Sequence, residues 1–264
     1  MTSESEQLPA AVRRERILSR VSENGFVRVA DLSREFGVSE VTVRSDLDAI
    51  ERESPIDRVH GGAVLRGSPS RREEPFESAL TTAALDKRLI GTAAARLVQS
   101  GMSVILDVGT TPAAVAAALL ARDDLDDLVV VTSSLTTALA LEPAIPRFTV
   151  VVTGGTLRPL QHSLVAPFAT KVLDELRVDV AFIGGTGVHP QGGVTNVNLA
   201  ETEVKRAMLL AADRAVVVAD ASKLGRIDLG RIGRLDEFRT LVTAGADAAT
   251  QESFARAGVE VISV

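Results

Sequence analysis

Residues 38–47 read VSEVTVRSDL. At 100° per residue, Val43, Leu47 and Ile50 share one face of a helix, and this apolar face is expected to be buried. Ser39 stands just before that face, where its hydroxyl can cap the helix N-terminus. The stretch therefore predicts a short amphipathic helix whose opposite surface is polar and exposed.

Two further helices are predicted before this one, with a short strand at 26–28 between them. Asn24-Gly25 is typical of a helix end, and Gly37-Val38 of a tight turn. The inward positions expected for the two helices are Ala11, Ile17, Leu18 and Val21 in the first, and Val29, Leu32 and Phe36 in the second.

The sequence PIDRVHGGAV, at 55–64, predicts a hairpin that turns at Gly61-Gly62. Three helices followed by a hairpin are typical of a winged helix-turn-helix, expected over residues 8–66. In such a domain, the first turns of the third helix enter the DNA major groove.

Candidate DNA contacts lie on the outer side of the third helix and on the hairpin. A valine can pack on a thymine methyl, and a serine hydroxyl can meet several base edges. Arginines and the hairpin side chains suit phosphates, which position the protein without specifying sequence. The alternatives are a protein-contact module of the same shape and, for the histidine, a surface or packing role. The candidates are Ser39, Val41, Thr42, Arg44, Ser45, Arg52, Arg58 and His60.

Composition is that of a globular protein, with 45% hydrophobic and 24% charged residues among 264. The net charge of −6 is unfavourable for a nucleic-acid binder, and residues 1–66 hold about as many acids as arginines. A DNA-binding surface must therefore be local. The absence of cysteine excludes disulfides, and MTSESEQLPA has no feature of a signal peptide, so a cytoplasmic location is expected.

The segment RGSPSRREEP, at 66–75, predicts a linker over residues 67–78 and a second domain over 79–264. Near-continuous Val and Ile runs in this domain predict a largely parallel sheet covered by helices, an α/β fold. The runs lie at 102–108, 128–133, 148–155, 178–185, 215–222, 239–245 and 259–264. Ligands of such sheets bind at the carboxyl ends of the strands.

The stretch DVGTTP, at 107–112, follows the first of these runs and opens a helix. The helix-start amides, with the hydroxyls of Thr110 and Thr111 and the turn at Gly109, predict an anion site. Asp107 is a candidate acceptor for sugar hydroxyls. The alternative is an ordinary helix cap after a glycine turn.

Other candidate ligand contacts also follow strands. Ser134 is equally a helix cap, and a glycine pair can merely turn the chain. Lys205 is equally the partner of Glu201 in an i,i+4 surface pair. The segment GGTG, at 184–187, is expected to lead into a long polar loop through Asn198. The set is Ser133, Ser134, Gly154, Gly155, Lys205, Asp220 and Lys223; no cofactor or metal motif is present.

Taken in order, the motifs resemble the DeoR family of bacterial transcriptional regulators over essentially the whole chain. They are R-x-x-R-I near 13–17, VSEVTVRSDL, RVHGGA (58–63), LDVGTT (106–111), VTSSL (131–135), VTGG (152–155), DVAFIGG (179–185) and ADASK (219–223). The family pattern differs at Ser45, Ser133, Ala166 and Thr243-Ala244, where it has a basic residue, Asn, Gly and Thr-Asp.

This resemblance implies an operator-binding winged helix-turn-helix and a sensor domain with a fold similar to ribose-5-phosphate isomerase and CoA transferases. It also implies a homo-oligomeric repressor, a dimer or tetramer, of carbohydrate-catabolism genes that a phosphorylated sugar or polyol releases from double-stranded DNA. Two alternatives remain: a sugar-phosphate isomerase with Asp107 or Asp220 as base, and a regulator whose sensor has lost its ligand.

Overall fold

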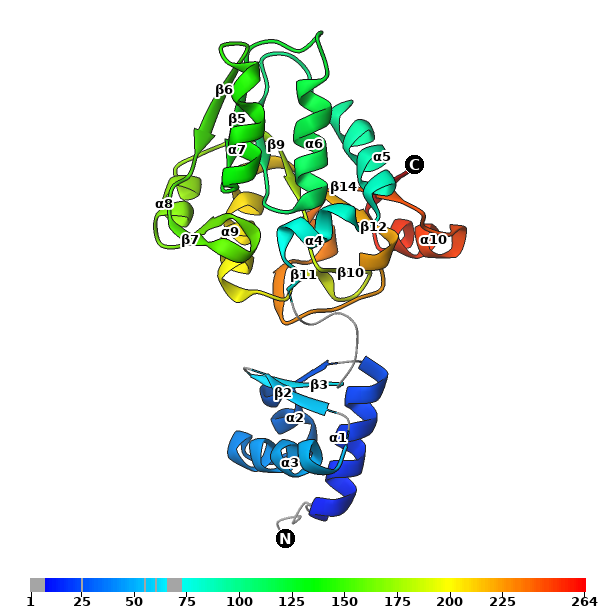
Figure 1. Ribbon diagram of the computed structural model, residues 1–264. Helices are drawn as coiled ribbons and strands as arrows, with labels where there is room; N and C mark the ends of the chain where they lie inside the picture. Colours follow the sequence, from blue (N-terminus) through cyan, green and yellow to red (C-terminus); the bar gives the residue numbers. More distant parts are fainter. Residues whose placement is uncertain (1–7, 25, 55, 60, 66–72) are drawn as a thin grey trace. The chain divides into compact units, whose positions relative to one another are not determined.

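The computed structural model describes residues 8–24, 26–54, 56–59, 61–65 and 73–264. The chain divides into two compact units, Met1–Arg72 and Glu73–Val264 (Figure 1). Within the described residues, none of the helices has the length and apolar character needed to cross a membrane.

The N-terminal unit consists of three helices and a three-stranded antiparallel sheet with the strand order β1-β3-β2. This arrangement confirms the helices, the short strand and the hairpin expected from the sequence. The elements are α1 Ala10–Asn24, β1 Phe26–Arg28, α2 Val29–Phe36, α3 Glu40–Glu53, β2 Ile56–Val59 and β3 Gly62–Leu65.

The inward face of α3 is the one the sequence predicts, because Val43, Leu47 and Ile50 are all buried. The expected inward face of α1 is partly wrong. Ala11 is exposed, whereas Arg13 is buried and donates from Nε to Asp46 of α3 at 2.6 Å. A buried carboxylate requires a paired cation, so this contact turns Arg13 toward the core in place of a smaller apolar residue.

The C-terminal unit is built on a seven-stranded parallel sheet with the order β15-β14-β12-β9-β4-β5-β6. Six of the seven runs rich in Val and Ile contain one of these strands and the seventh, 215–222, overlaps β12, which confirms the α/β expectation. They are β4 Ser103–Leu106, β5 Leu128–Thr132, β6 Phe148–Val152, β9 Val178–Ile183, β12 Ala212–Asp220, β14 Thr240–Ala244 and β15 Glu260–Ser263.

The central strands β4 and β9 are neighbours, and the chain winds outward from them in opposite directions. In a sheet of this kind, the crevice at the carboxyl ends of two such strands is the usual place for a ligand. The topology therefore brings the segments after β4 and β9, residues 107–112 and 184–187, to one edge of the sheet.

Helices cover both faces of the sheet. Helices α5, α6 and α7 cover one face (Figure 1), where their side chains pack with Val104 and Leu106 of β4. The side chains of α8, α9 and α10 pack on the other face, which contains Ile105. The helices are α4 Phe76–Thr81, α5 Ala84–Ala95, α6 Thr110–Leu120, α7 Leu135–Leu141, α8 Phe168–Asp174, α9 Leu199–Ala211 and α10 Ala248–Arg256, with 3-10 turns at Glu142–Ala144, Pro159–Gln161, Ala221–Lys223 and Leu235–Glu237.

Two small sheets were not expected. The polar loop predicted through Asn198 is wrong, because β10 Gly187–His189, β11 Gly193–Asn196 and β13 Gly230–Gly233 form an antiparallel sheet there. Val188 and Val194 are completely buried in it, and their burial stabilises strands in a glycine-rich sequence. A hairpin, β7 Thr156–Arg158 and β8 Ser163–Val165, follows β6.

The expected linker over 67–78 is too long at its C-terminal end. Helix α4 begins at Phe76, whose side chain is buried and lies 5.8 Å from the ring of His162, measured between ring centroids. Burial of this aromatic ring holds the segment against the hairpin, so the second compact unit begins at Glu73.

Candidate functional site

The outer face of α3 presents several side chains to solvent. Val41 is 71% exposed, and Arg44, Ser45 and Arg52 are exposed as well. Ser39 caps the helix as predicted, accepting a hydrogen bond from the backbone N–H of Thr42 at 3.1 Å. The first turns of the helix are therefore well formed and expose a mixed apolar and polar surface.

Acidic residues of α3 are largely compensated within the N-terminal unit. Asp46 accepts from Nε of Arg13 and from Nε of Arg14, at 2.6 and 2.9 Å. Glu40 accepts from Arg44 at 2.6 Å on the exposed side. Two acidic side chains of α3 are therefore paired with arginines of the same unit. Of the expected contacts on the hairpin, the side chain of Arg58 and all of His60 lie outside the described residues.

Asp107 and Lys205 form a buried ion pair at the crevice between β4 and β9. Asp107 is completely buried; Oδ2 accepts from the Lys205 ammonium and from the Gly184 N–H at 2.9 Å, and Oδ1 accepts from the Val108 N–H at 2.7 Å. The ammonium also approaches the carbonyl oxygens of Val108 and Gly184, at 3.5 and 3.4 Å. The pair thus joins the loops after both central strands.

In the structure, both members of this pair are buried and engaged with protein groups; their roles as ligand contacts stay a prediction. Burial raises the pKa of Asp107, and the neighbouring Lys205 ammonium and Gly184 N–H oppose that rise. The surface i,i+4 pair between Glu201 and Lys205 does not form, because Lys205 turns inward to Asp107. Asp107 thus has no solvent-exposed surface and joins the loops after both central strands.

Asp220, at the end of β12, is buried too. Its Oδ1 accepts from the N–H of Ser222 at 2.9 Å and from the Ser222 hydroxyl, so it caps the turn that leads to Lys223. The role of Asp220 as a ligand contact stays a prediction. Lys223 is half-buried in the 3-10 turn that follows the carboxyl end of β12.

The N-terminus of α6 has the arrangement expected of an anion site. Gly109 adopts φ +121°, and Thr110 begins the helix directly after it. The first turn of a helix leaves its N–H groups without intrahelical acceptors, and Thr110 and Thr111 supply two of them. Gly109 and Thr110 are half-buried, which leaves them accessible to a small ligand, whereas Thr111 is mostly buried.

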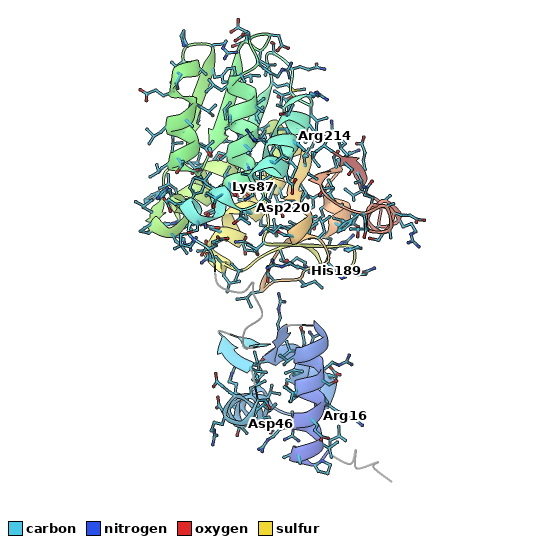
Figure 2. The ribbon with its side chains drawn as sticks, turned by 45° about the vertical axis from the view of Figure 1, so that its right-hand side comes forward. Arg16, Asp46, Lys87, His189, Arg214 and Asp220 are labelled. Carbon is cyan, nitrogen blue, oxygen red and sulfur yellow. The ribbon has the colours of Figure 1, made fainter. Side chains whose placement is uncertain are left out.

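Lys87 is a cation of this region that the sequence motifs did not indicate. It is 6% exposed in α5, and the nearby charges of Asp220 and Lys223 both act on its pKa, which burial lowers (Figure 2). A Cβ on Gly91 would lie 2.4 Å from the carbonyl oxygen of Ala114, so α5 and α6 touch there. Lys87 is one turn before that contact on α5, as Thr110 is on α6.

The remaining candidates make contacts within the protein, and their roles as ligand contacts stay predictions. Ser134 caps α7 by accepting from the Thr137 N–H at 3.1 Å, and the carbonyl of Ser133 accepts from the Leu164 N–H at 2.8 Å. A Cβ on Gly155 would lie 2.2 Å from the Val165 carbonyl oxygen, so this glycine permits close approach of β8. Gly154 has open space around it.

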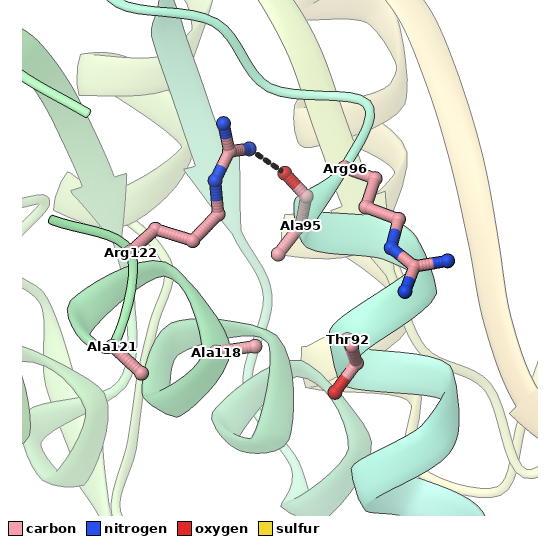
Figure 3. A pocket seen from close by; sticks show the side chains of 6 residues that line it. All are labelled: Thr92, Ala95, Arg96, Ala118, Ala121 and Arg122. Atoms are coloured by element: carbon pink, nitrogen blue, oxygen red, sulfur yellow. Dashed lines mark hydrogen bonds between the residues drawn. The ribbon is translucent and has the colours of Figure 1, made fainter. Parts of the chain in front are cut away.

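A surface pocket of about 470 Å³ lies elsewhere, between the C-terminal ends of α5 and α6 (Figure 3). Arg122 there donates to the carbonyl of Ala95 at 2.7 Å and pairs with Asp124, so it ties the two helix ends together. The pocket lies toward the amino ends of the strands, and none of the predicted ligand contacts lines it. Its lining residues are Thr92, Ala95, Arg96, Ala118, Ala121 and Arg122. Within the described chain, no cluster of three metal-binding side chains occurs.

Comparison with known families agrees with both units. The sequence model of the DeoR-like helix-turn-helix domain matches residues 13–68, and that of the DeoR C terminal sensor domain matches residues 82–245. Together they span most of the chain and both candidate sites. The chain is therefore a DNA-binding transcriptional regulator, and it belongs to the DeoR family.

Full-length relatives lead to the same class of protein. The chain is 36% identical over 258 residues to a "Putative aga operon transcriptional repressor" of Escherichia coli O157:H7, covering 96% of this chain and 93% of the relative. It is 30% identical over 227 residues to the "Glycerol-3-phosphate regulon repressor" of Escherichia coli K12, covering 85% and 88%. A solved ribose 5-phosphate isomerase A from Methanocaldococcus jannaschii aligns over 52% of this chain and 53% of its own at 22% identity, with a TM-score of 0.39.

Proposed function

We propose that the protein represses carbohydrate-catabolism genes and that a phosphorylated sugar or polyol relieves the repression. The observation that carries this proposal is the first turn of α6, where Gly109 turns the chain and Thr110 and Thr111 supply amides at the crevice between β4 and β9. Helix N-termini favour anions through these amides and through the helix dipole.

Two lysines support a phosphate at this place. Lys223 is half-buried at the end of β12, and Lys87 lies on α5 near it. The Lys87 ammonium donates to the carbonyl oxygens of Ala79 and Thr82 at 2.7 and 2.6 Å, which leaves one of its three N–H donors for a ligand. A doubly charged phosphate would relieve the repulsion between these two lysines.

The named relatives are consistent with a ligand of this class. One is called a glycerol-3-phosphate regulon repressor, a title that names a phosphorylated polyol. The ligand would act by binding one arrangement of a homo-oligomer better than another, because only differential affinity shifts a conformational equilibrium. A dimer would read two half-sites about one helical turn apart, or a multiple of it.

A thermal-shift screen of phosphorylated sugars and polyols on the full-length protein tests the effector. Glycerol 3-phosphate belongs in the panel, with unphosphorylated glycerol as its control. A ligand present at about 100 times its Kd stabilises the folded state by roughly 2.7 kcal/mol. If no compound of the panel shifts the transition, the sensor does not bind this class of ligand.

Matched variants localise the site. Lys223→Met should abolish most of the shift that a phosphorylated hit causes, because it removes a point charge from the phosphate. Lys171→Met is the control, since Lys171 is an exposed lysine of α8. Equal shifts in the two variants would place the ligand away from the crevice.

Operator selection tests the DNA-binding role. Duplexes selected from a random library by the full-length protein should contain two related half-sites. The same duplexes should be released by the compound that gives the thermal shift. Release by no compound of the panel, with a confirmed thermal shift, would contradict relief of repression by that ligand.

A further inference from the structure

The first residues of the C-terminal unit are held by the β7–β8 hairpin. We call residues 73–82 the root segment, because they follow directly on the stretch that leads from the DNA-binding unit. Arg158 of β7 donates to both carboxylate oxygens of Glu73, at 3.1 and 2.5 Å, and Gln161 donates to the Glu74 carbonyl. His162 lies 3.3 Å from a carboxylate oxygen of Glu77.

Arg158 also has a second carboxylate partner. Its Nη1 donates to Oε1 of Glu201 in α9, a residue that is 5% exposed. Glu201 accepts in addition from the Ser163 hydroxyl at 2.7 Å and from Nδ2 of Asn196 at 3.4 Å. One guanidinium is therefore shared between a carboxylate of the root segment and a carboxylate of the sensor core.

Glu201 lies one helical turn before Lys205 in α9. The two residues turn to different partners, Glu201 to Arg158 and Lys205 to Asp107. The two pairs still interact electrostatically, since the negative charge of Glu201 contributes to the raised pKa of Asp107. A row of alternating charges thus runs from the crevice to the root segment: Asp107, Lys205, Glu201, Arg158 and Glu73.

We propose that Arg158 is a positioning residue that couples the state of the Asp107–Lys205 pair to the root segment through Glu201. A change at the crevice that alters the pairing of Lys205 with Asp107 also alters the charge beside Glu201. It thereby changes the competition between Glu201 and Glu73 for the Arg158 guanidinium. The local i,i+4 pair between Glu201 and Lys205 provides the alternative arrangement of these charges. This role deepens the proposed effector response and rests on it.

A double-mutant cycle in the full-length protein tests the coupling. The crevice is perturbed by replacing both members of its pair at once, Asp107→Asn with Lys205→Met, so that no uncompensated charge stays buried. The root segment is read through hydrogen exchange of the backbone amides of α4. In the otherwise unaltered protein, this change should raise their exchange by roughly tenfold.

In an Arg158→Gln background, the same crevice change should raise exchange less than about twofold, because the connection is already broken. Arg206→Gln is the control background, since Arg206 is an α9 arginine that pairs with Glu237 at 2.6 Å instead of with the root segment. There the tenfold effect should persist. Equal effects in the Arg158 and Arg206 backgrounds would overturn the proposal.

A second perturbation covers the case in which the paired replacement does not fold. Glu201→Gln keeps the hydrogen bonds from Ser163 and Arg158 but removes the charge, and it should give the same dependence on Arg158. Isothermal titration with glycerol 3-phosphate and with inorganic phosphate separates the two proposals. Coupling in a protein that binds neither compound supports the relay and counts against these two ligands, whereas binding with strictly additive variants supports the effector and overturns the relay.

Discussion

Asp107 and Lys205 stand 98 positions apart in the chain and meet as a fully buried ion pair at the carboxyl ends of β4 and β9. The carboxylate also accepts backbone hydrogen bonds from Val108 and Gly184, so one side chain fixes the loops on both sides of the crevice. The stability of the C-terminal unit and the shape of its candidate ligand site therefore depend on the same two residues.

Asp107→Asn is expected to destabilise the protein by about 3–5 kcal/mol, because it leaves the Lys205 ammonium buried without its counter-charge. Adding Lys205→Met to this variant should recover part of the loss. Chemical denaturation followed by circular dichroism measures both. Glu252→Gln, which breaks an exposed pair with Arg256, should change the free energy of unfolding by less than about 1 kcal/mol. Similar losses in Asp107→Asn and Glu252→Gln would show that the buried pair is not needed.

Arg44→Ala is expected to weaken binding to the selected DNA and to reduce the salt slope of log K by about 0.9, the value of one phosphate contact. Ser45→Arg should have the opposite effect, since it adds a cation to the exposed face of α3. Fluorescence anisotropy over a range of salt concentrations measures both slopes. The assignment of this helix would fail if Arg44→Ala bound the DNA as the unaltered protein does.

His189 should make stability depend on pH in the acid range. Its Nδ1 accepts from the N–H groups of Gln191 and Gly192, both at 3.1 Å, and burial lowers its pKa from the ordinary value of 6.5. Because the unfolded chain takes up the proton first, this contribution to stability is present above pH 6.5 and is lost as the pH falls toward the lowered pKa. His189→Asn keeps an acceptor that does not titrate. The free energy of unfolding, measured by denaturation at several pH values, should fall less steeply with decreasing pH for the variant.

Gly155 and Gly154 form a matched pair for a packing test. Both adopt positive φ, but a Cβ would meet the Val165 carbonyl oxygen at 2.2 Å only at Gly155. Gly154→Ala should cost about 1–2 kcal/mol, the strain of a left-handed residue. Gly155→Ala should cost more than about 4 kcal/mol, because β8 must move away. Equal thermal denaturation midpoints would contradict the close approach of the hairpin.

Features that depend on local periodicity could be predicted from the sequence. Val43, Leu47 and Ile50 repeat with the period of a helix, and the runs of Val and Ile are long enough to indicate buried parallel strands. The strands around Val188 and Val194 were missed, because glycines and polar residues interrupt the pattern there. Their stability comes from burial against distant parts of the chain.

The candidate site was harder to predict than the fold. A cluster such as Gly109 to Thr111 is visible because its residues are adjacent. The partner of Lys205 is not, since a local pair with Glu201 competes with a tertiary pair that exists only once the sheet has formed. Lys87 lies in no motif, and only the folded chain, in which α5 packs against α6, brings it near the charges of Asp220 and Lys223.

The division of the chain between Arg72 and Glu73 separates the helix that addresses DNA from the crevice that would read a metabolite. Each unit has its own apolar core, so the fold of one unit does not depend on the residues of the other. Exchange of residues 1–72 for those of another family member should redirect the protein to different genes under an unchanged chemical cue. The choice of DNA and the proposed ligand response would then be exchangeable between family members one unit at a time.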